Sequence, residues 1–346
     1  MRVFYIGHTS PESTSRHRAG ALTRLGHDVI LADPYAALYT HLQGRIRGAM
    51  HYRTGYRLLQ TAVCAWIDEL LLQYASWPEV VWVNGGELIG ARAAKKLKQF
   101  GVPIVIYNND DPTGGRDGHR FDSMLAALPA YDLCVVVREP NVREFQAMGA
   151  RAVHKVWMSY DEVQHRPFEN AYKIPSRFRS DIAFVGTWIR GEERDHFLMS
   201  LIQRGLNIAI WGDRWQKAPS WKRLKPYWRG HALTGRDYVA AIQGAKLNLG
   251  LLSKGNRDLH TTRSVEIPYA GGLLCAEHTA EHCQLYCDGT EAVFWRDAKE
   301  CTEICKELLQ DEPRREGIRI QGARRLVSNQ LGNEDICRSV IDRLIS

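Results

Sequence analysis

The segment that decides the fold reads LNLGLLSKGNRDLHTTRSVEIPYAGGLLCAE and covers Leu247–Glu277. The apolar runs at its two ends have the length and composition of buried parallel strands. Between them lies a loop rich in charged residues, which leads into a short helical pattern that ends at two glycines. A charged loop between buried strands is typical of a ligand site at the carboxyl ends of a parallel sheet.

The same alternation of short apolar strand, turn and helix extends in both directions from this segment, which predicts parallel sheets with helices on both faces. The predicted strands are Arg2–Gly7, Gly26–Asp33, Val80–Val83, Ile104–Tyr107 and Leu133–Val137, then Asp181–Gly186, Ile208–Gly212, Lys246–Leu252, Gly271–Glu277 and Glu291–Trp295. The predicted helices include Ser15–Leu25, Leu88–Phe100, Pro140–Met148, His196–Arg204, Ala298–Gln310, Pro313–Asn329 and Glu334–Ile345. The stretch His165–Ser180 has two prolines and little periodicity, so we predict that it links two similar doubly wound halves.

Composition favours a globular protein of two domains. The chain has 346 residues, of which 45% are hydrophobic and 25% charged. No run approaches the roughly 18 apolar residues of a membrane-spanning helix. The first residues, MRVFYIGHTS, turn polar too soon for a signal peptide and predict a first strand, so a cytoplasmic protein is expected.

The eight cysteines are scattered, with no CxxC pair, which favours free buried thiols over disulfides. One group could hold zinc by its spacing: His278, His282, Cys283 and Cys287. Such paired spacing arises easily by chance on a short amphipathic helix. We therefore predict no metal site.

The net charge of +7 and a pI near 9.0 suit anionic ligands, namely nucleotide diphosphates, phospholipid surfaces or nucleic acid. The densest basic stretch, Trp211–Gly230, alternates Lys and Arg with tryptophans. Such a stretch can stack on bases or lie on lipid headgroups. The favoured interpretation is a connection whose tryptophans pack inward and whose charges are solvated.

The ends of the predicted strands in the second half carry the candidate donor-binding residues. Glycines permit close backbone approach, and cations near helix starts suit a diphosphate. In the Leu247–Glu277 segment a carboxylate can accept hydrogen bonds from ribose hydroxyls. The candidates are Gly186, Thr187, Arg190, Arg194, Gly212, Asp213, Lys254, Asn256, His260, Thr261, Thr262 and Glu266, with Asp258 and Arg263 as catalytic candidates.

Strand ends in the first half carry a second set, which we assign to the acceptor side. Most suggestive is the NDDP turn, where Asp110 and Asp111 are candidate catalytic residues that orient or deprotonate a hydroxyl. The alternative is a turn in which the Asp side chains bond their own backbone. The other acceptor-side candidates are Gly7, His8, Arg16, Glu87, Asn108 and Glu139.

A family resemblance is carried by SKGNRDLHTTRSVEIPYAGGLLCAEHTAEH and continues through GTEAVFWRDAKECTEICKELLQDEPRREGIRIQGARR. These segments resemble the donor domain of CgeB-like (spore-maturation-protein-like) glycosyltransferases, which are related to the family 4 glycosyltransferases. The segments YNNDDPTGG, YDLCVVVREPNVREFQAMGA and HRP are also similar to that family. The resemblance covers most of Ile104–Asn329, and its core is R-x-x-E-x-x-x-x-G placed between two strands.

The resemblance implies a GT-B fold, with two Rossmann-like domains facing across a cleft. It implies an acceptor-side domain at residues 1–167, a donor-binding domain at 168–330, and a last helix at 331–346 that crosses back to the first domain. In family 4 enzymes two acidic residues eight positions apart flank the helix, and the second holds the ribose. Asp258 and Glu266 match those positions, although Asp258 is one methylene shorter than the usual glutamate and Pro268 interrupts the helical pattern.

The predicted activity is transfer of a hexose-like sugar from a nucleotide-diphosphate donor to a hydroxyl, with retention and with no metal or other cofactor. A glycan, a lipid-linked molecule or a protein is the expected acceptor, with peripheral contact at the inner face of the membrane as a further expectation. Two alternatives stay open at this point. One is a GT-B nucleotide-sugar epimerase, and the other is a non-catalytic protein that binds nucleic acid or an anionic membrane, of which nucleic acid is the less favoured.

Overall fold

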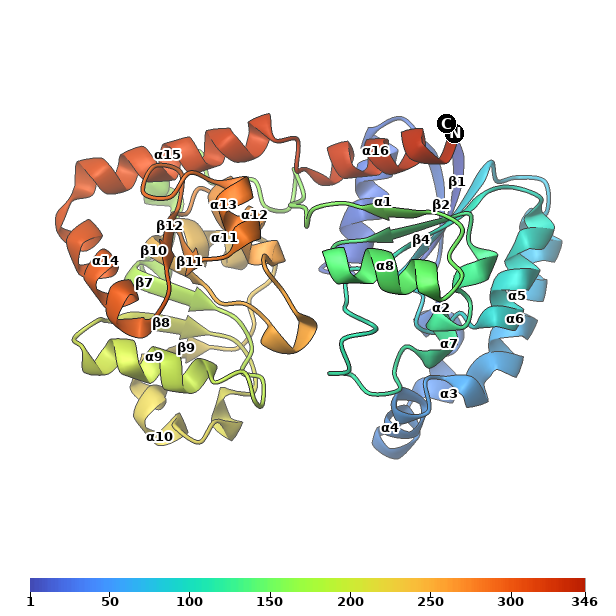
Figure 1. Ribbon diagram of the computed structural model, residues 1–346, viewed down its shortest axis with the longest axis horizontal. Coiled ribbons are helices and arrows are strands. Elements are labelled where there is room, and N and C mark those ends of the chain that lie inside the picture. Colours follow the sequence, from blue (N-terminus) through green and yellow to red (C-terminus); the bar gives the residue numbers. More distant parts are fainter. Residues whose placement is uncertain (346) are drawn as a thin grey trace. The chain divides into compact units, whose positions relative to one another are not determined.

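The computed structural model describes residues 1–345, which fold into two compact units (Figure 1). The first unit contains Met1–Trp157, the short segment Gly255–Arg257 and the last helix, α16 (Asn333–Ile345). The second unit contains Met158–Lys254 and Asp258–Gly332. The domain boundary expected between residues 167 and 168 therefore lies inside the second unit.

The first unit is built on a six-stranded sheet in which all neighbouring strands are parallel. In sheet order its strands are β2 (Asp28–Ala32), β1 (Arg2–Ile6), β3 (Val80–Asn84), β4 (Ile104–Tyr107), β5 (Leu133–Val136) and β6 (Val153–Lys155). The chain order reverses between β1 and β3, which is where a doubly wound sheet binds ligands at its carboxyl ends. The sequence prediction missed β6, a short edge strand whose three residues are only half-buried.

Helices cover both faces of this sheet (Figure 1). Its helices are α1 (Thr14–Arg24), α2 (Pro34–Ala37), α3 (Tyr39–Leu42), α4 (Arg45–Arg53), α5 (Gln60–Tyr74), α6 (Ala91–Leu97), α7 (Asp122–Leu125), α8 (Glu139–Ala147) and α16. On one face, buried strand residues such as Phe4 and Ile106 pack with residues of α5 and α6. Helix α16 packs against α1, where Arg24 and Glu334 form an ion pair of 2.5 Å.

The second unit has its own six-stranded parallel sheet. In sheet order its strands are β12 (Val293–Trp295), β11 (Leu274–Glu277), β10 (Ala245–Gly250), β7 (Ser180–Val185), β8 (Ile208–Trp211) and β9 (Trp228–Gly230). This is the Rossmann order, and its reversal falls between β7 and β10. Strand β9 was not predicted, because it lies inside the tryptophan-rich stretch.

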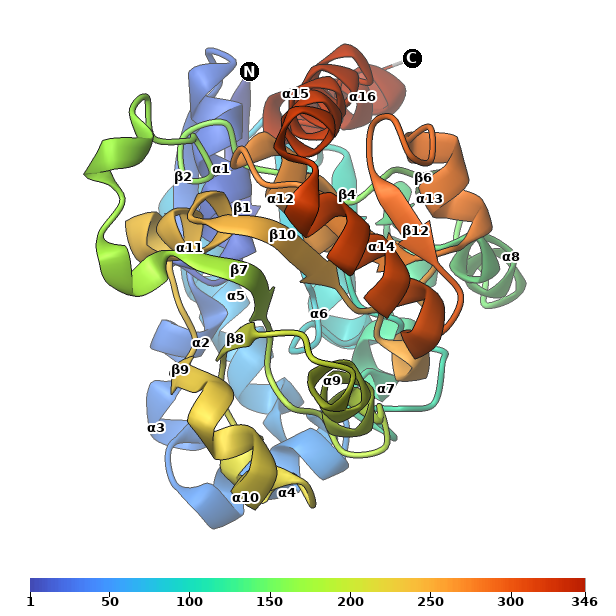
Figure 2. The same cartoon turned by 90° about the vertical axis from the view of Figure 1, so that its left-hand side faces the viewer.

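The helices of the second unit are α9 (Arg194–Gln203), α10 (Trp221–Leu224), α11 (Gly235–Gln243), α12 (Thr262–Tyr269), α13 (Ala280–Leu285), α14 (Ala298–Gln310) and α15 (Glu312–Ser328). Helix α14 packs against α9 and α15, and α15 also packs against α12 (Figure 2). The core beneath them contains aliphatic residues of β7, β8 and β10. The long charged loop after β10 is thus held between two buried strands.

The tryptophans of Trp211–Gly230 pack inward, which confirms the favoured interpretation of that stretch. Trp215 is fully buried, and its indole Nε1 donates to the Gly186 carbonyl at 2.9 Å. Trp221 and Trp228 are half-buried against the same core. These rings are therefore not available to stack on bases or to enter a lipid surface.

Candidate functional site

The carboxyl ends of β7 and β10 are joined by Arg194, the first residue of α9. Its guanidinium donates from Nη1 to the Thr187 carbonyl at 2.9 Å and from Nη2 to the Leu252 carbonyl at 3.1 Å. Arginine keeps its positive charge in proteins, including where backbone carbonyls hold it. Arg194 thus brings a cation to the point where the strand order reverses.

Two predicted glycines allow the ends of β7 and β8 to approach closely. Gly212 has φ +145, and a Cβ there would lie 2.1 Å from the Gly186 carbonyl oxygen, so only glycine fits. The neighbouring Asp213 is half-buried and accepts from His231 at 2.8 Å. That hydrogen bond holds the pKa of Asp213 below its ordinary value.

Glu266 lies in a closed polar cluster, with 4% of its surface exposed. Its Oε2 accepts from Tyr238 Oη at 2.6 Å and from the Arg263 guanidinium, and its Oε1 lies 3.8 Å from His165 Nε2. Burial alone would raise the pKa of Glu266, but the charges of Arg263 and His165 hold it below its ordinary value. The carboxylate is therefore ionised and fixed in one orientation.

The predicted cation Arg263 is engaged within the same cluster. Besides the bond to Glu266, its Nε donates to the Val185 carbonyl at 3.2 Å, and its guanidinium lies 4.7 Å from the Tyr238 ring centroid. Arg263 therefore connects the end of β7 to α12. The adjacent Thr262 is half-buried, and its hydroxyl lies 3.4 Å from Arg263 Nη1.

The loop that leads into α12 is anchored by α13 rather than left open. His260 is 2% exposed; its Nδ1 lies 2.5 Å from Glu281 Oε2, and its Nε2 accepts from the Met158 N–H at 3.0 Å. Thr261 and Ser264 cap the start of α12 reciprocally. Both ring nitrogens of His260 are engaged by the protein, so this predicted donor-binding residue positions the loop instead of presenting a free ligand atom.

The remaining donor-side candidates differ in exposure. Arg190 is exposed in the loop after β7. Asp258 is 8% exposed, and its N–H donates to the Ser253 carbonyl at 3.3 Å. Asn256 is also 8% exposed and belongs to the first unit with Arg257.

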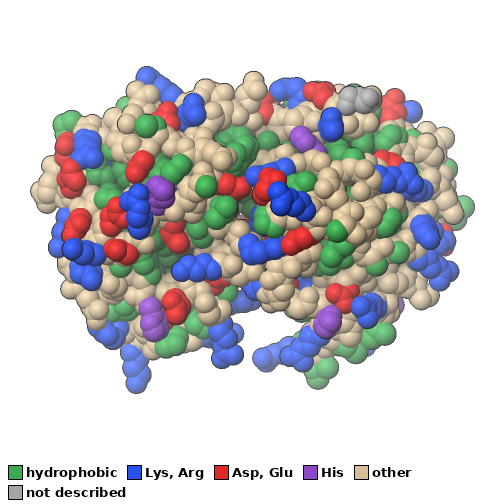
Figure 3. Space-filling model, viewed as in Figure 1, with side chains coloured by type: hydrophobic (Ala, Val, Ile, Leu, Met, Phe, Trp, Pro, Cys, Tyr) green, Lys and Arg blue, Asp and Glu red, His purple; other side chains and the backbone are tan. Residues whose placement is uncertain are grey.

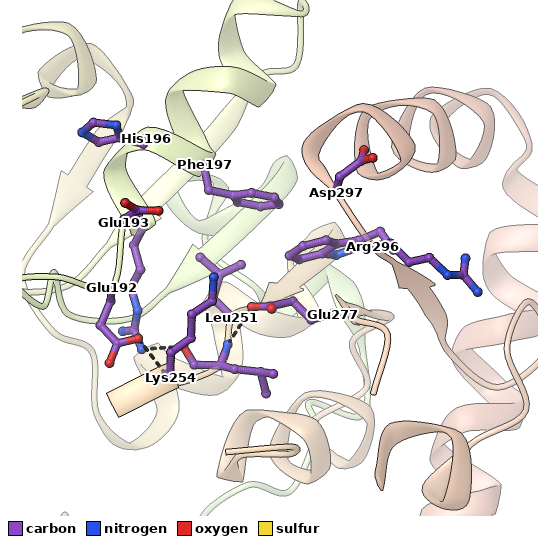
Figure 4. Close-up of a pocket in the computed structure, with 12 residues that line it drawn as sticks. Glu192, Glu193, His196, Phe197, Leu251, Lys254, Glu277, Arg296 and Asp297 are labelled. Atoms are coloured by element: carbon purple, nitrogen blue, oxygen red, sulfur yellow. Dashed lines mark hydrogen bonds between the residues drawn. The ribbon is translucent and has the colours of Figure 1, made fainter. Parts of the chain in front are cut away.

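A cavity of about 260 Å³ lies at the ends of β10, β11 and β12 (Figure 4). It contains two predicted residues, Arg194 and Lys254. Its lining is Glu192, Glu193, Arg194, His196, Phe197, Leu251, Leu252, Lys254, Glu277, Trp295, Arg296 and Asp297. Among residues 1–345 the ammonium of Lys254 has no carboxylate within ion-pair distance, and the residue is exposed. Its charge is therefore available to an anionic ligand.

The cavity lining has four acidic residues that the sequence prediction missed: Glu192, Glu193, Glu277 and Asp297. Glu192 accepts from the Ser253 hydroxyl at 3.1 Å and from the Lys254 N–H at 2.8 Å, and Glu277 accepts from the Leu252 N–H at 3.4 Å. In Figure 4 they lie on either side of the Leu251–Lys254 backbone. The last position of a predicted strand was the available signal for Glu277, whereas nothing local distinguishes Glu192 from other glutamates before a helix.

In the first unit, the Asp111 carboxylate forms an ion pair with Arg257. This carboxylate is fully buried and accepts both Nε and Nη2 of Arg257, at 2.6 and 2.7 Å, and Asn141 Nδ2 at 2.8 Å. Although burial acts in the opposite direction, these hydrogen bonds hold the pKa of Asp111 below its ordinary value. Glu144 pairs with the same arginine at 2.7 Å. A carboxylate so engaged is a poor base, which disfavours a catalytic role for Asp111.

Asp110 has a different environment from its neighbour. Its side chain is 40% exposed and lies 3.9 Å from Arg120 Nη1. Partial burial, with the nearby carboxylates Glu87 and Asp117, raises the pKa of Asp110 above its ordinary value. A raised pKa on an accessible carboxylate suits a group that exchanges protons.

Two further predicted residues fix the groups that lie around Asp110. Glu87 accepts from Tyr35 Oη at 2.6 Å and from Arg120 Nε at 2.5 Å, so it fixes the arginine beside Asp110. Asn108 is buried, and its Oδ1 accepts from the Asp110 N–H at 2.7 Å. These contacts give Glu87 and Asn108 positioning roles.

The other acceptor-side candidates surround the first strand and α8. A Cβ at Gly7 would lie 2.3 Å from Ser15 Oγ, so glycine lets α1 start close to β1. His8 and Arg16 are exposed, and His8 lies edge-on to the Tyr35 ring. Glu139 is exposed and pairs with Lys155 at 3.3 Å.

All eight cysteines are free thiols; six are buried, as predicted, whereas Cys283 and Cys287 are exposed. Of the zinc candidates, His282 is buried and bonds Ser264 Oγ and the Glu277 carbonyl, while Cys283 Sγ lies 3.5 Å from His278 Nε2. Within residues 1–345, one group of three or more His, Cys, Asp or Glu residues has its possible metal-ligand atoms within 4.8 Å of one another. It consists of Cys275, Cys301 and Cys305. These thiols lie in the apolar core, and hydrogen bonding with its two neighbours raises the pKa of Cys275.

Residues 193–334 match a family model described as glycosyl transferase-like. The comparison with curated protein sequences gave no significant match. Similar solved structures include HepE from Anabaena in complex with UDP and glucose (TM-score 0.66, 10% identity, 99% of each chain covered). Sucrose-phosphate synthase from Thermosynechococcus elongatus gives a TM-score of 0.69 at 11% identity, with 99% of this chain and 98% of that chain covered.

This protein has the GT-B fold. The trehalose 6-phosphate synthase from Burkholderia multivorans is also similar, with a TM-score of 0.60 at 12% identity over 99% of this chain and 96% of that chain. The GT-B fold matches the two six-stranded parallel sheets described above. No helix within residues 1–345 is long and apolar enough to cross a membrane.

Proposed function

We propose that this protein is a glycosyltransferase that moves a hexose-like sugar from a nucleotide-diphosphate donor to a hydroxyl acceptor, with retention, as a CgeB-like relative of the family 4 enzymes. One observation carries the proposal. The family match over residues 193–334 contains Arg194, Lys254, Arg263 and Glu266, which lie at the strand ends of a Rossmann-ordered sheet. Two cavity-lining cations and a fixed, ionised carboxylate there suit a diphosphate and a ribose.

The proposed roles follow from the charges. As the bond between the sugar and the diphosphate breaks, negative charge develops on the leaving phosphate oxygen, and Arg194 and Lys254 stabilise it. Glu266 accepts hydrogen bonds from the ribose hydroxyls, while Asp258 contacts the sugar and Arg263 holds Glu266 in place. The acceptor oxygen forms the new bond on the face of the sugar from which the diphosphate leaves, which retains the configuration, and Asp110 takes the acceptor's proton.

UDP is the first nucleotide to test, because structures that share the fold were solved with UDP and with UDP-glucose. We further propose a cytoplasmic location and a glycan, a lipid-linked molecule or a protein as acceptor. Residues 168–330 would form the donor-binding domain and residues 1–167 the acceptor side.

Titration of UDP tests the donor site directly. UDP is expected to raise the melting temperature and to bind the unaltered protein measurably in a calorimeter. Lys254→Gln is expected to weaken that binding at least roughly 10-fold, because one charged hydrogen bond contributes about 1.5–3 kcal/mol. The matched control is Lys246→Gln, an exposed lysine at 2.7 Å from Asp181 on neighbouring strands.

The results of these measurements distinguish a donor site from the alternatives. Equal weakening in both lysine variants, or no binding of UDP, GDP or ADP, contradicts the donor site. Release of free nucleotide from UDP-glucose without an acceptor, with the sugar epimerised, indicates an epimerase instead of a transferase.

Transfer is expected to survive chelation, because cationic side chains supply the charge stabilisation at the proposed donor site. Initial rates with and without excess EDTA should agree within about twofold. A rate that falls under EDTA and returns only with a divalent ion would contradict a metal-independent mechanism.

A further inference from the structure

The segment between α2 and α5 has a charge pattern that the proposed reaction does not use. Residues 34–67 contain no Asp or Glu but include Arg45, Arg47, Arg53 and Arg57. Within this segment α4 carries three of these arginines, at the tip of the first unit (Figure 1).

One face of α4 is exposed and combines basic with apolar side chains. Arg45, Ile46, Ala49, Met50 and Arg53 fall within about 140° of one another around the helix, at 100° per residue. All five are exposed; the exposed fractions of Ile46 and Met50 are 88% and 43%. We call these five residues the α4 face. Of the other four residues of α4, His51 is buried (6% exposed) and Gly48 is half-buried, whereas Arg47 and Tyr52 are exposed.

The charge of the α4 face is not neutralised within the protein. Across residues 1–345, neither Arg45 nor Arg53 has a carboxylate within ion-pair distance. Arg47, which is also exposed, donates to the Thr40 carbonyl at 2.9 Å, and Arg57 pairs with Asp122 at 2.7 Å. Two unpaired guanidinium groups therefore flank the apolar side chains of α4.

Further apolar side chains lie on the neighbouring elements. Helix α3 packs against α4 and carries Tyr39, which is 63% exposed, and Leu58 beyond α4 is 64% exposed. Figure 3 shows basic and hydrophobic side chains next to one another at this end of the first unit. Side chains so exposed contribute nothing to the core, and a patch of such side chains is typical of an interaction surface.

We propose that the α4 face docks this protein on an anionic membrane surface. Arginines meet lipid phosphates, and Ile46 and Met50 enter the boundary between headgroups and acyl chains. A nucleic acid would pair with the arginines but would leave the apolar side chains in water. The interleaving of both kinds of side chain on one helix face thus favours a lipid surface.

Flotation with vesicles tests this proposal without donor or acceptor, so its outcome is independent of the glycosyltransferase assignment. The unaltered protein should float with vesicles containing phosphatidylglycerol and stay behind with pure phosphatidylcholine. Arg45→Gln with Arg53→Gln should lower the partition coefficient roughly 25-fold, at about fivefold for each arginine. Ile46→Ser with Met50→Ser should lower it on the order of tenfold.

The matched control changes one side chain of each kind elsewhere on the first unit. Leu72 on α5 is 87% exposed, and Arg92 on α6 is exposed. The variant Leu72→Ser with Arg92→Gln should partition within about twofold of the unaltered protein. Every variant changes only exposed side chains. Circular dichroism with thermal melting verifies that each variant is folded.

Three results would overturn the proposal. The first is partition of the unaltered protein that does not depend on anionic lipid. The second is a control variant that loses binding as much as the α4 variants do. The third is a loss confined to the arginine changes, with the apolar variant unaffected, which would indicate a surface for a polyanion such as nucleic acid.

Discussion

Asp110→Asn is expected to lower turnover by roughly 10²- to 10⁴-fold, the range typical of a removed general base. Asp110 is the one residue of the NDDP turn whose carboxylate is both accessible and raised in pKa. Its neighbour Asp111 has its carboxylate fully buried against Arg257. Affinity for UDP should change less than about twofold, since we assign Asp110 to the acceptor side.

The pH dependence of kcat also tests the role of Asp110 as a base. A base works in its deprotonated form, so kcat should rise with pH through the raised pKa of Asp110 and then level off. That rise should lie at higher pH than the titration of an ordinary aspartate. Asp110→Asn should remove it.

Asp68→Asn is the control for Asp110→Asn, because Asp68 is a half-exposed carboxylate on α5 paired with Lys96. It should keep full turnover and the unaltered pH profile. Full turnover in Asp110→Asn, or loss of UDP binding in that variant, would refute the acceptor-side assignment.

Glu266→Ala is expected to weaken UDP binding by roughly 10- to 150-fold, because a charged hydrogen bond contributes about 1.5–3 kcal/mol. Burial and two donors fix the carboxylate, and its Oε1 retains acceptor capacity, with His165 as far away as 3.8 Å. A preoriented carboxylate can bind a ribose hydroxyl with little ordering cost.

The structure also raises a competing explanation for Glu266. Removing one partner of a buried ion pair costs roughly 3–5 kcal/mol of folding stability, since Arg263 would be left without its carboxylate. Affinity must therefore be measured by calorimetry on samples shown to be folded by circular dichroism. Tyr238→Phe disturbs the same cluster but keeps the carboxylate, so it should weaken UDP binding by less than about fivefold. Equal weakening in the two variants would mean that Glu266 only supports the fold.

Much of the fold was predictable from local patterns. Short runs such as Ile104–Tyr107 are apolar at every position, which predicts strands buried on both faces, and their spacing predicts helical crossovers. The pattern failed at β6 and β9, which are short edge strands with mixed polarity. Edge strands are buried on fewer sides, so their sequences carry a weaker signal.

The candidate site was predictable only in part. The rule that ligands bind at the carboxyl ends of strands led to Arg194 and Lys254, and the structure places both on one cavity. It did not lead to Glu192, whose contacts are to Ser253 and to the backbone of Lys254, more than fifty residues further along the chain. The hydrophobic periodicity of a short segment carries no information about a hydrogen-bond partner so far along the chain.

The sequence by itself determined the class of the fold, the strand ends where charged residues gather, and the absence of acidic residues around α4. Only the tertiary structure decided which charges are neutralised. Asp110 and Asp111 are adjacent in sequence, yet Arg257 pairs with Asp111 from 146 positions away, and Asp110 keeps an accessible carboxylate. The physical reason is that the energy of a charge depends on burial and on its distance from other charges. Both quantities are set when residues remote in the chain pack together.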